Sequence, residues 1–175
     1  MIREDQIKDE VLKQVVGHML IAARTAPKGR GIDNLILTIA EKPDLKRIAD
    51  KMTEIGERLS APFFMRDAAN IMQSAYMLIF AAKINSIGMD CGWCGLSDCK
   101  QKDISPKTPC VFNITDLGIA VGSAVSVAAD LKVDCRVLYS AGRAVKEMNL
   151  LGDEAMVILC VPLSATSKSP FFDRV

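Results

Sequence analysis

The chain lacks the features that mark several common protein classes. Lys and Arg total 22 against 21 Asp and Glu, so the formal net charge is only +1. A balance this even leaves no overall field to attract nucleic acid or an acidic membrane surface. The longest stretch without a charged residue, residues 68–82, has 15 residues and includes Asn70, Gln73 and Ser74. Because a helix needs about 20 apolar residues to cross a bilayer, we expect no membrane-spanning segment.

An export signal is also missing from the start of the sequence. Residues 1–5 lead directly into an amphipathic helical pattern, with no apolar stretch of the kind found in signal peptides. We therefore expect a cytoplasmic protein. In a reducing cytosol, cysteines serve in metal or redox chemistry more often than in disulfides.

Common catalytic motifs are scarce as well. His18 is the only histidine, and it has no acidic neighbour in the sequence, which argues against a catalytic triad or a histidine-rich metal site. No G-x-G-x-x-G motif follows a predicted strand, and no general acid–base pair is visible. The sequence therefore indicates neither a nicotinamide site nor a substrate.

The composition that remains is that of a globular protein, with 50% apolar and 25% charged residues. Internal repeats, low-complexity tracts and linkers are absent from the sequence, so we expect residues 1–175 to form a single domain. Apolar spacing predicts its elements. Helices are expected at residues 4–26, from Pro43 to Leu59, from Arg66 to Gly88, and from Thr115 or Asp116 onward; strands are expected at residues 34–40, 133–137 and 155–163. This mixed order predicts an α+β layered fold.

Two of the expected helices favour pairing with a second copy of the chain. The helix from Arg66 to Gly88 is apolar on almost every side, and we expect it to be the central, buried helix. Gly118, Gly122 and Ser126 recur at intervals of four, and such small residues let another backbone approach closely. Together these surfaces exceed what one small domain easily covers, so we expect a homodimer.

Four of the six cysteines cluster in a loop-like segment, residues 89–110. They are Cys91, Cys94, Cys99 and Cys110, spaced C-x2-C-x4-C-x10-C. Three thiolates this close can wrap one corner of a cluster while the fourth returns from the end of the loop, as a [4Fe-4S] cluster requires. Cys135 and Cys160 lie far downstream in apolar, strand-like sequence, where free cysteine packs as a small hydrophobe. We expect only the first four to ligate one metal centre.

Other residues of this segment fit the same chemistry. Gly92 and Gly95 follow the first two cysteines and, without a β-carbon, can turn their amides toward a ligand. Trp93 lies between those cysteines, and we expect it to shield the centre from water. Three lysines are offset by three aspartates, so the sign of the local potential is open. These are Lys100, Lys102, Lys107, Asp90, Asp98 and Asp103.

The cysteine spacing leaves two alternatives open. A structural zinc site with four cysteine ligands usually shows two separate C-x2-C pairs, and the second pair is missing here. Reactive thiols, or thiols that are merely buried, are the other alternative.

The sequence CGWCGLSDC at residues 91–99, with Cys110 beyond it, resembles the CGxCGxxxC four-iron cluster motif of electron-transfer and corrinoid iron–sulfur subunits of anaerobes. A second resemblance covers nearly the whole chain. AARTAP at residues 22–27, followed by a strand, and DAANIMQSA at residues 67–75, leading to Gly88, look like the nitroreductase layout. With the ending SPFFDR at residues 169–174, the chain resembles a family of prokaryotic proteins described as uncharacterised and containing a ferredoxin domain.

The nitroreductase resemblance implies an α+β fold with a mixed or antiparallel sheet flanked by helices, FMN at a dimer interface, and an intertwined homodimer. The chain departs from that pattern at the FMN residues. No Arg-Arg-Ser type segment precedes the first helix, Lys28 stands in place of the usual Ser, and Gly31 stands in place of the usual Asn.

Arg24, Lys28 and Arg30, with two glycines, are candidates for a substitute phosphate cradle, and if FMN binds we expect it to bind weakly through this turn. A plain basic turn is the alternative. Arg143 is a further candidate for the same role, with a solvated arginine at a helix start as its alternative.

Two functions stay open at this point. The first is an iron–sulfur redox protein of nitroreductase-like type, with or without FMN, that transfers electrons between a redox partner protein and an unknown substrate. The second is a non-enzymatic binding or assembly module in which the four cysteines hold zinc or a cluster only to fix the loop.

Overall fold

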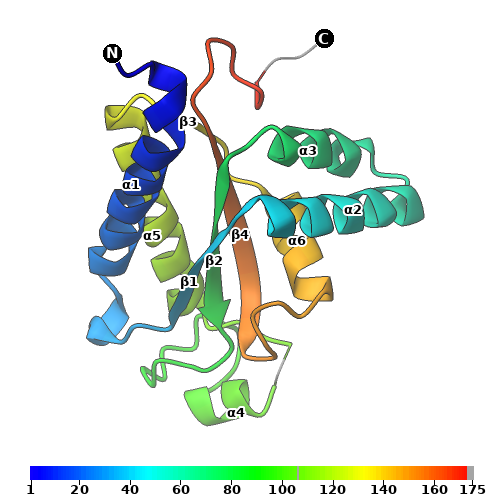
Figure 1. Ribbon diagram of the computed structural model, residues 1–175. Helices are drawn as coiled ribbons and strands as arrows, with labels where there is room; N and C mark the ends of the chain where they lie inside the picture. Colours follow the sequence, from blue (N-terminus) through cyan, green and yellow to red (C-terminus); the bar gives the residue numbers. More distant parts are fainter. Residues whose placement is uncertain (106, 173–175) are drawn as a thin grey trace.

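A four-stranded sheet forms the centre of the computed structural model, which describes residues 1–105 and 107–172 (Figure 1). The strands follow the order β1-β2-β4-β3, and every neighbouring pair is antiparallel. The strands are β1 (Leu35–Ala40), β2 (Tyr76–Lys83), β3 (Asp134–Cys135) and β4 (Ala155–Ser164). The α+β class and the antiparallel sheet expected from the sequence are confirmed.

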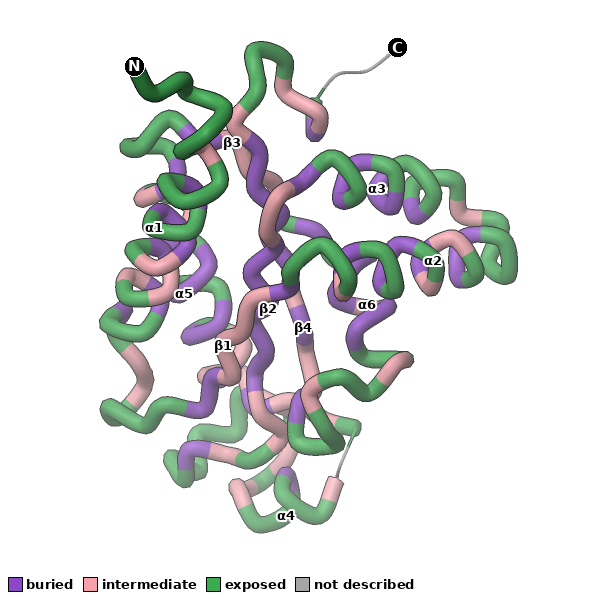
Figure 2. Tube along the Cα trace, in the orientation of Figure 1, coloured by how far each residue is buried: buried purple, intermediate pink, exposed green. Residues whose placement is uncertain are grey.

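Two layers of helices cover the sheet. One face carries α1 (Glu4–Thr25) and α5 (Val111–Asp130). The other face carries α2 (Lys42–Leu59), α3 (Pro62–Met72) and α6 (Tyr139–Glu147). A 3-10 turn, η1 (Gly29–Gly31), follows α1, and the short helix α4 (Cys99–Asp103) lies beyond the end of β2. Figure 2 shows that the buried positions gather on the strands and on the helix sides that face them.

Strand β2 is buried on both faces of the sheet. Met77 and Ile79 pack with α2, α3 and α6, whereas Leu78 and Phe80 pack with α1 and α5. The prediction of one helix from Arg66 to Gly88 is therefore wrong, because α3 ends at Met72 and β2 begins at Tyr76. A strand covered on both faces reads as a continuous apolar run, and the period of two that would reveal a strand is lost.

The first two helices confirm their sequence patterns closely. In α1 the apolar stripe is buried from Leu12 onward, while Ile7 and Val11 are exposed. Helix α2 carries Pro43 in its first turn, where a missing N–H costs nothing. Helix α5 begins at Val111, earlier than Thr115 or Asp116, with Cys110 as its N-cap residue. Asp116 caps no helix. It is buried, and both of its carboxylate oxygens accept the N–H of Gly29, which joins α5 to the turn after α1.

Helix α5 packs against α1 and β2 but leaves one side open. Gly118 and Gly122 are exposed, and a β-carbon added at either would meet no atom within 4 Å. The close approach expected at these glycines is therefore not made within the described part of the chain. By length and composition α5 could also cross a membrane, alone among the described helices. A cytoplasmic location stays a prediction.

Candidate metal centre

The cysteine segment, residues 89–110, lies beyond the end of the sheet where β2 ends, and it leads into α5 (Figure 1). All four clustered cysteines are on this segment. Cys135 is in β3, and Cys160 is fully buried in β4. Burial raises the pKa of both of these sheet thiols, which disfavours the thiolate form needed for ligation.

The four clustered thiols are free and differ in burial. Cys91 is exposed, Cys94 and Cys99 are half-buried, and Cys110 is 7% exposed. Within the described residues, no group of three or more His, Cys, Asp or Glu side chains is arranged to hold a metal ion. The structure therefore brings the four cysteines into one segment without closing them around a common point. As donors, four unpaired thiols in one surface segment fit a thiophilic metal or an iron–sulfur cluster.

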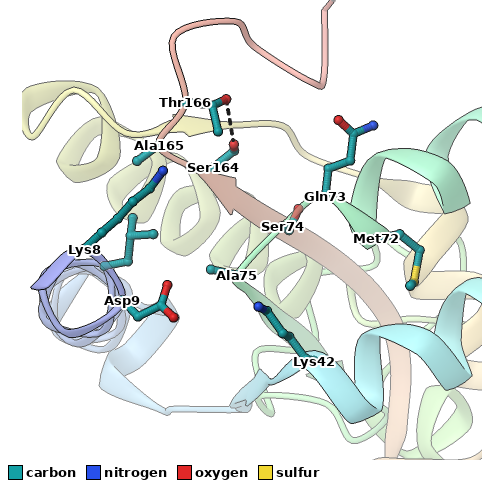
Figure 3. A pocket seen from close by; sticks show the side chains of 11 residues that line it. Lys8, Asp9, Lys42, Met72, Gln73, Ser74, Ala75, Ser164, Ala165 and Thr166 are labelled. Carbon is teal, nitrogen blue, oxygen red and sulfur yellow. Dashed lines mark hydrogen bonds between the residues drawn. The ribbon is translucent and has the colours of Figure 1, made fainter. Parts of the chain in front are cut away.

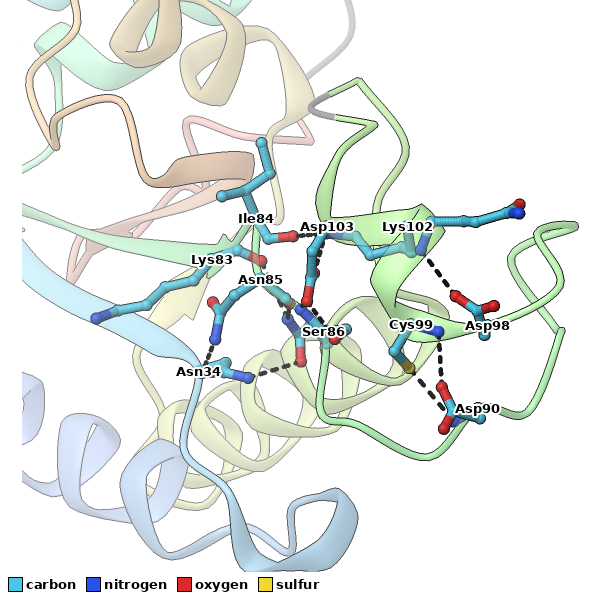
Figure 4. A network of polar contacts seen from close by, with 12 residues as sticks. Asn34, Lys83, Ile84, Asn85, Ser86, Asp90, Asp98, Cys99, Lys102 and Asp103 are labelled. Carbon is cyan, nitrogen blue, oxygen red and sulfur yellow. Dashed lines mark hydrogen bonds and ion pairs between the residues drawn. The ribbon is translucent and has the colours of Figure 1, made fainter.

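Cys99 is held by reciprocal contacts with Asp90 (Figure 4). The N–H of Asp90 donates to the Cys99 sulfur at 3.3 Å, and the N–H of Cys99 donates to Asp90 Oδ1 at 2.7 Å. Asp98 is the N-cap of α4 and accepts the N–H of Gln101 at 2.8 Å. That hydrogen bond, together with one from Ser97, lowers the pKa of Asp98. The Asp90 N–H that donates to the Cys99 sulfur stabilises negative charge on that sulfur, as such donors do in iron–sulfur proteins.

The two glycines of the motif adopt the conformation expected of them. Gly92 and Gly95 have φ values of 70° and 83°. The N–H of Gly95 donates to the carbonyl of Gly92 at 2.9 Å, which closes a tight turn that carries Cys94. The left-handed backbone is thus confirmed, while the Gly95 amide serves the turn itself.

Trp93 packs on α5. Its indole stacks on the ring of Phe112, with 5.3 Å between the ring centroids, and 69% of Trp93 stays exposed. The stack ties the first half of the segment to the start of α5 near Cys110. The described contacts of Trp93 fix the loop, and a role in shielding the thiols stays a prediction.

A second set of contacts ties the other half of the segment to the end of β2 (Figure 4). Lys102, which is 2% exposed, donates from its ammonium to the carbonyl of Ile84 and pairs with Asp103 at 3.2 Å. Asp103 also accepts the N–H and hydroxyl of Ser86, each at 2.9 Å. The sequence marks Lys102 only as a charge, because a five-residue helix has too short a pattern to reveal which side is buried.

The basic turn after α1 is committed to contacts within the protein. The Lys28 ammonium donates to the carbonyls of Ala23, Arg24 and Ala26 at 2.7 to 3.1 Å. An ammonium has three N–H donors, so none is left for a phosphate. The turn as described does not fit a phosphate cradle centred on Lys28.

The other candidate cations also have partners. Arg24 pairs with Asp33. Arg30, at φ 54°, donates to the carbonyls of Ile87 and Gly88. These hydrogen bonds fix the backbone directly before the cysteine segment. Arg24, Lys28 and Arg30 lie in and beside the turn after α1, but their charged groups contact different partners. The structure places Arg143 on α6, on the opposite face of the sheet, where its guanidinium contacts Glu147 and Tyr139.

A shallow hollow of about 240 Å³ lies at the opposite end of β2 from the cysteine segment (Figure 3). Lys8 and Asp9 of α1, Lys42 of α2 and the hydroxyls of Ser164 and Thr166 line it. It is separate from the thiols.

A family model described as "Uncharacterized protein containing a ferredoxin domain (DUF2148)" matches residues 107–174, which include Cys110 but not the other three clustered cysteines. A protein of Archaeoglobus fulgidus described as "Uncharacterized protein" is 37% identical over 184 residues, which span 99% of this chain and 97% of that protein.

Several solved structures share the fold. One described as "The crystal structure of the oxidoreductase containing FMN" superposes with a TM-score of 0.62 and 15% identity, over 89% of this chain and 68% of that chain. A nitroreductase family protein from Clostridium novyi NT superposes with a TM-score of 0.61 and 16% identity, over 87% of this chain and 73% of that chain. A nitroreductase with bound FMN from Desulfitobacterium hafniense DCB-2 superposes with a TM-score of 0.59 and 13% identity, over 92% of this chain and 82% of that chain. The nitroreductase-like fold is confirmed, and identities this low show the fold alone.

Proposed function

Because the chain belongs to the family described as "Uncharacterized protein containing a ferredoxin domain (DUF2148)", we propose that it is a redox protein whose four clustered cysteines bind one [4Fe-4S] cluster. The observation that carries the proposal is the placement of the thiols. Four free cysteines share one segment beyond the end of the sheet, and the other two lie in the sheet. Soft thiolate ligands match iron, and a cluster bound there would supply one-electron transfer.

The chain's own residues prepare the segment for such a group. The Asp90 amide already donates to the Cys99 sulfur, and Gly92 and Gly95 fold the backbone tightly around Cys94. Cys91 is exposed, which is consistent with electron exchange at the protein surface with a redox partner protein. In this function these residues orient the thiols, and they neither transfer protons nor contact a substrate.

The proposed function does not depend on FMN. Some proteins with this fold are described as containing FMN. In this chain, however, the Lys28 donors are used by backbone carbonyls and Arg24 pairs with Asp33. Weak flavin binding through this turn stays a prediction.

A structural site that holds zinc or a cluster is the second candidate function. The observation that favours it is the irregular backbone of residues 89–110, where α4 is the only helix among the described residues. A metal with four cysteine ligands would fix such a loop without any redox role.

The test is anaerobic purification followed by iron, sulfide and zinc analysis and a visible spectrum. We expect about four iron and about four sulfide per chain, because that is the content of one [4Fe-4S] centre. The visible spectrum should show a broad absorption at about 400 nm. Cys94→Ser should remove most of the iron, whereas Cys135→Ser, the matched control, should leave it in place. One tightly bound zinc without sulfide would favour the structural site instead. Equal metal loss in both variants would overturn the ligand assignment.

A further inference from the structure

Lys102 is buried in a segment that is otherwise largely exposed. Only 2% of the residue is accessible, whereas its neighbours Gln101 and Asp103 are exposed. A lysine is almost never fully buried unless its charge is paired and hydrogen-bonded, because removing an ammonium from water is costly. Its environment must therefore supply the partners.

Those partners come from the end of β2 and from the same short helix. The ammonium donates to the carbonyl of Ile84, directly after β2, and pairs with Asp103 at 3.2 Å. Asp103 in turn accepts both the N–H and the hydroxyl of Ser86. Two consecutive residues of α4 are thus bonded to residues 17 and 18 positions earlier in the sequence.

Helix α4 starts at Cys99, so these contacts also locate a proposed metal ligand. On the other side of the same helix start, the Asp90 and Cys99 contacts bind the two arms of the loop together. Every one of these bonds is made by protein groups alone. The segment therefore has internal support that does not require a metal.

We propose that Lys102 and Asp103 form a clamp that positions Cys99 and the cysteine segment against the end of β2 in the metal-free protein. Lys102 is a positioning residue: it acts through α4. The use of the clamp, which is to hold one ligand-bearing helix in place while the other thiols close on a metal, rests on the proposed function, whereas its existence does not. A ligand that is already held in place favours binding because less ordering is needed on association.

The clamp can be tested by thiol alkylation of the reduced, metal-free full-length chain. Iodoacetamide is added, and the rate at each cysteine is followed by peptide mass spectrometry. We expect Lys102→Met to raise the alkylation rate of Cys99 at least fivefold. Lys100→Met is the matched control, because Lys100 is an exposed lysine on the same helix, and it should leave that rate unchanged. Cys160, buried in β4, reports unfolding of the whole protein and should stay protected.

A second variant guards against simple misfolding. Asp103→Ala removes the exposed half of the clamp and leaves the buried Lys102 ammonium with only the Ile84 carbonyl as a partner. Lys102 should then move toward solvent, which should speed alkylation of Cys99 but not of Cys160. The clamp is overturned if Cys99 reacts equally fast in Lys102→Met and Lys100→Met. It is also overturned if Cys160 becomes reactive in parallel with Cys99 in both clamp variants, because the contacts would then support the whole fold.

Cobalt binding separates the clamp from the metal centre. Titration with Co²⁺ alone, followed by thiolate-to-cobalt absorption, should show at least tenfold weaker binding in Lys102→Met than in Lys100→Met. If the unaltered protein binds no Co²⁺ and no iron, the proposed metal centre fails, and the alkylation rates still decide the clamp. If Co²⁺ binds equally well to both variants, the clamp does not position the ligands.

Discussion

At the scale of single residues, Lys28 shows how a charge that reads as a ligand contact can serve the fold. It follows the end of α1, where unpaired carbonyls form the negative end of the helix dipole. Its ammonium accommodates three of those carbonyls at once. The same residue in the sequence alone is one of three cations beside two glycines, and that pattern cannot distinguish a helix cap from an anion site.

Replacing Lys28 with Met is therefore expected to lower the free energy of unfolding by about 1–2 kcal/mol, the usual range for a charged group at a helix C-terminus with partial burial. Urea unfolding followed by circular dichroism measures the change. Lys13→Met on the same helix is the control, because Lys13 is exposed and its distant pair with Glu41 should contribute less than about 0.5 kcal/mol. Equal losses in the two variants would contradict a capping role for Lys28.

At the scale of elements, the contact between α6 and β4 depends on Gly142. A β-carbon at this position would lie 2.0 Å from the carbonyl oxygen of Ile158, far inside van der Waals contact with backbone that cannot rotate away. The glycine thus lets α6 lie directly on the strand.

We expect Gly142→Ala to destabilise the protein by at least about 2 kcal/mol, because α6 must move off β4 to admit the methyl group. Gly17→Ala is the matched control, since Gly17 lies within α1 and a β-carbon there meets nothing within 4 Å. It should raise stability by about 0.5–1 kcal/mol through helix propensity. Thermal unfolding of the two variants compares them, and a tolerated Gly142→Ala would mean that α6 packs differently.

The same elements show what the sequence determines locally and what it does not. Helices α1 and α2 each have one solvent face, so their period of 3.6 is visible in the sequence. Strand β1 is a short apolar run bounded by turn residues, and the boundaries of all three elements are predicted within a residue or two. Strand β2 is buried on both faces and shows no such period, so the apolar pattern alone does not distinguish this strand from a buried helix. Helix α5 starts without a side-chain cap at Cys110, which explains why Thr115 and Asp116 read as its beginning.

The candidate site divides in the same way. Cysteine spacing and the two glycines are local features, and the sequence places them in one segment, although Cys99 begins the short helix α4 within it. The contacts of Lys102 with Ile84 and of Asp116 with Gly29 join residues far apart in the chain. Such contacts depend on how the sheet brings two loops together, and no spacing rule within one segment can reveal them.

At the scale of the whole molecule, the exposed side of α5 is the surface that a second copy of the chain would cover. One of the two surfaces expected to pair in a dimer is not available, because the apolar run at residues 76–83 is a strand already covered on both faces. What remains is the exposed stripe of Gly118, Gly122 and Ser126, with Ile119 beside it at 42% exposure. Small residues next to an exposed isoleucine suit the close approach of a second helix.

We therefore still propose a homodimer, now through α5 alone, and expect light scattering to give twice the 19.0 kDa chain mass. Gly122→Arg should shift the mass toward the monomer, because a long charged side chain would hold a facing helix away and leave its charge buried. Gln73→Arg adds the same charge at an exposed position beyond the end of α3 and should leave the dimer intact. A monomer mass for the unaltered protein at high concentration would contradict pairing. A dimer that persists in Gly122→Arg would place the interface on another face of the molecule.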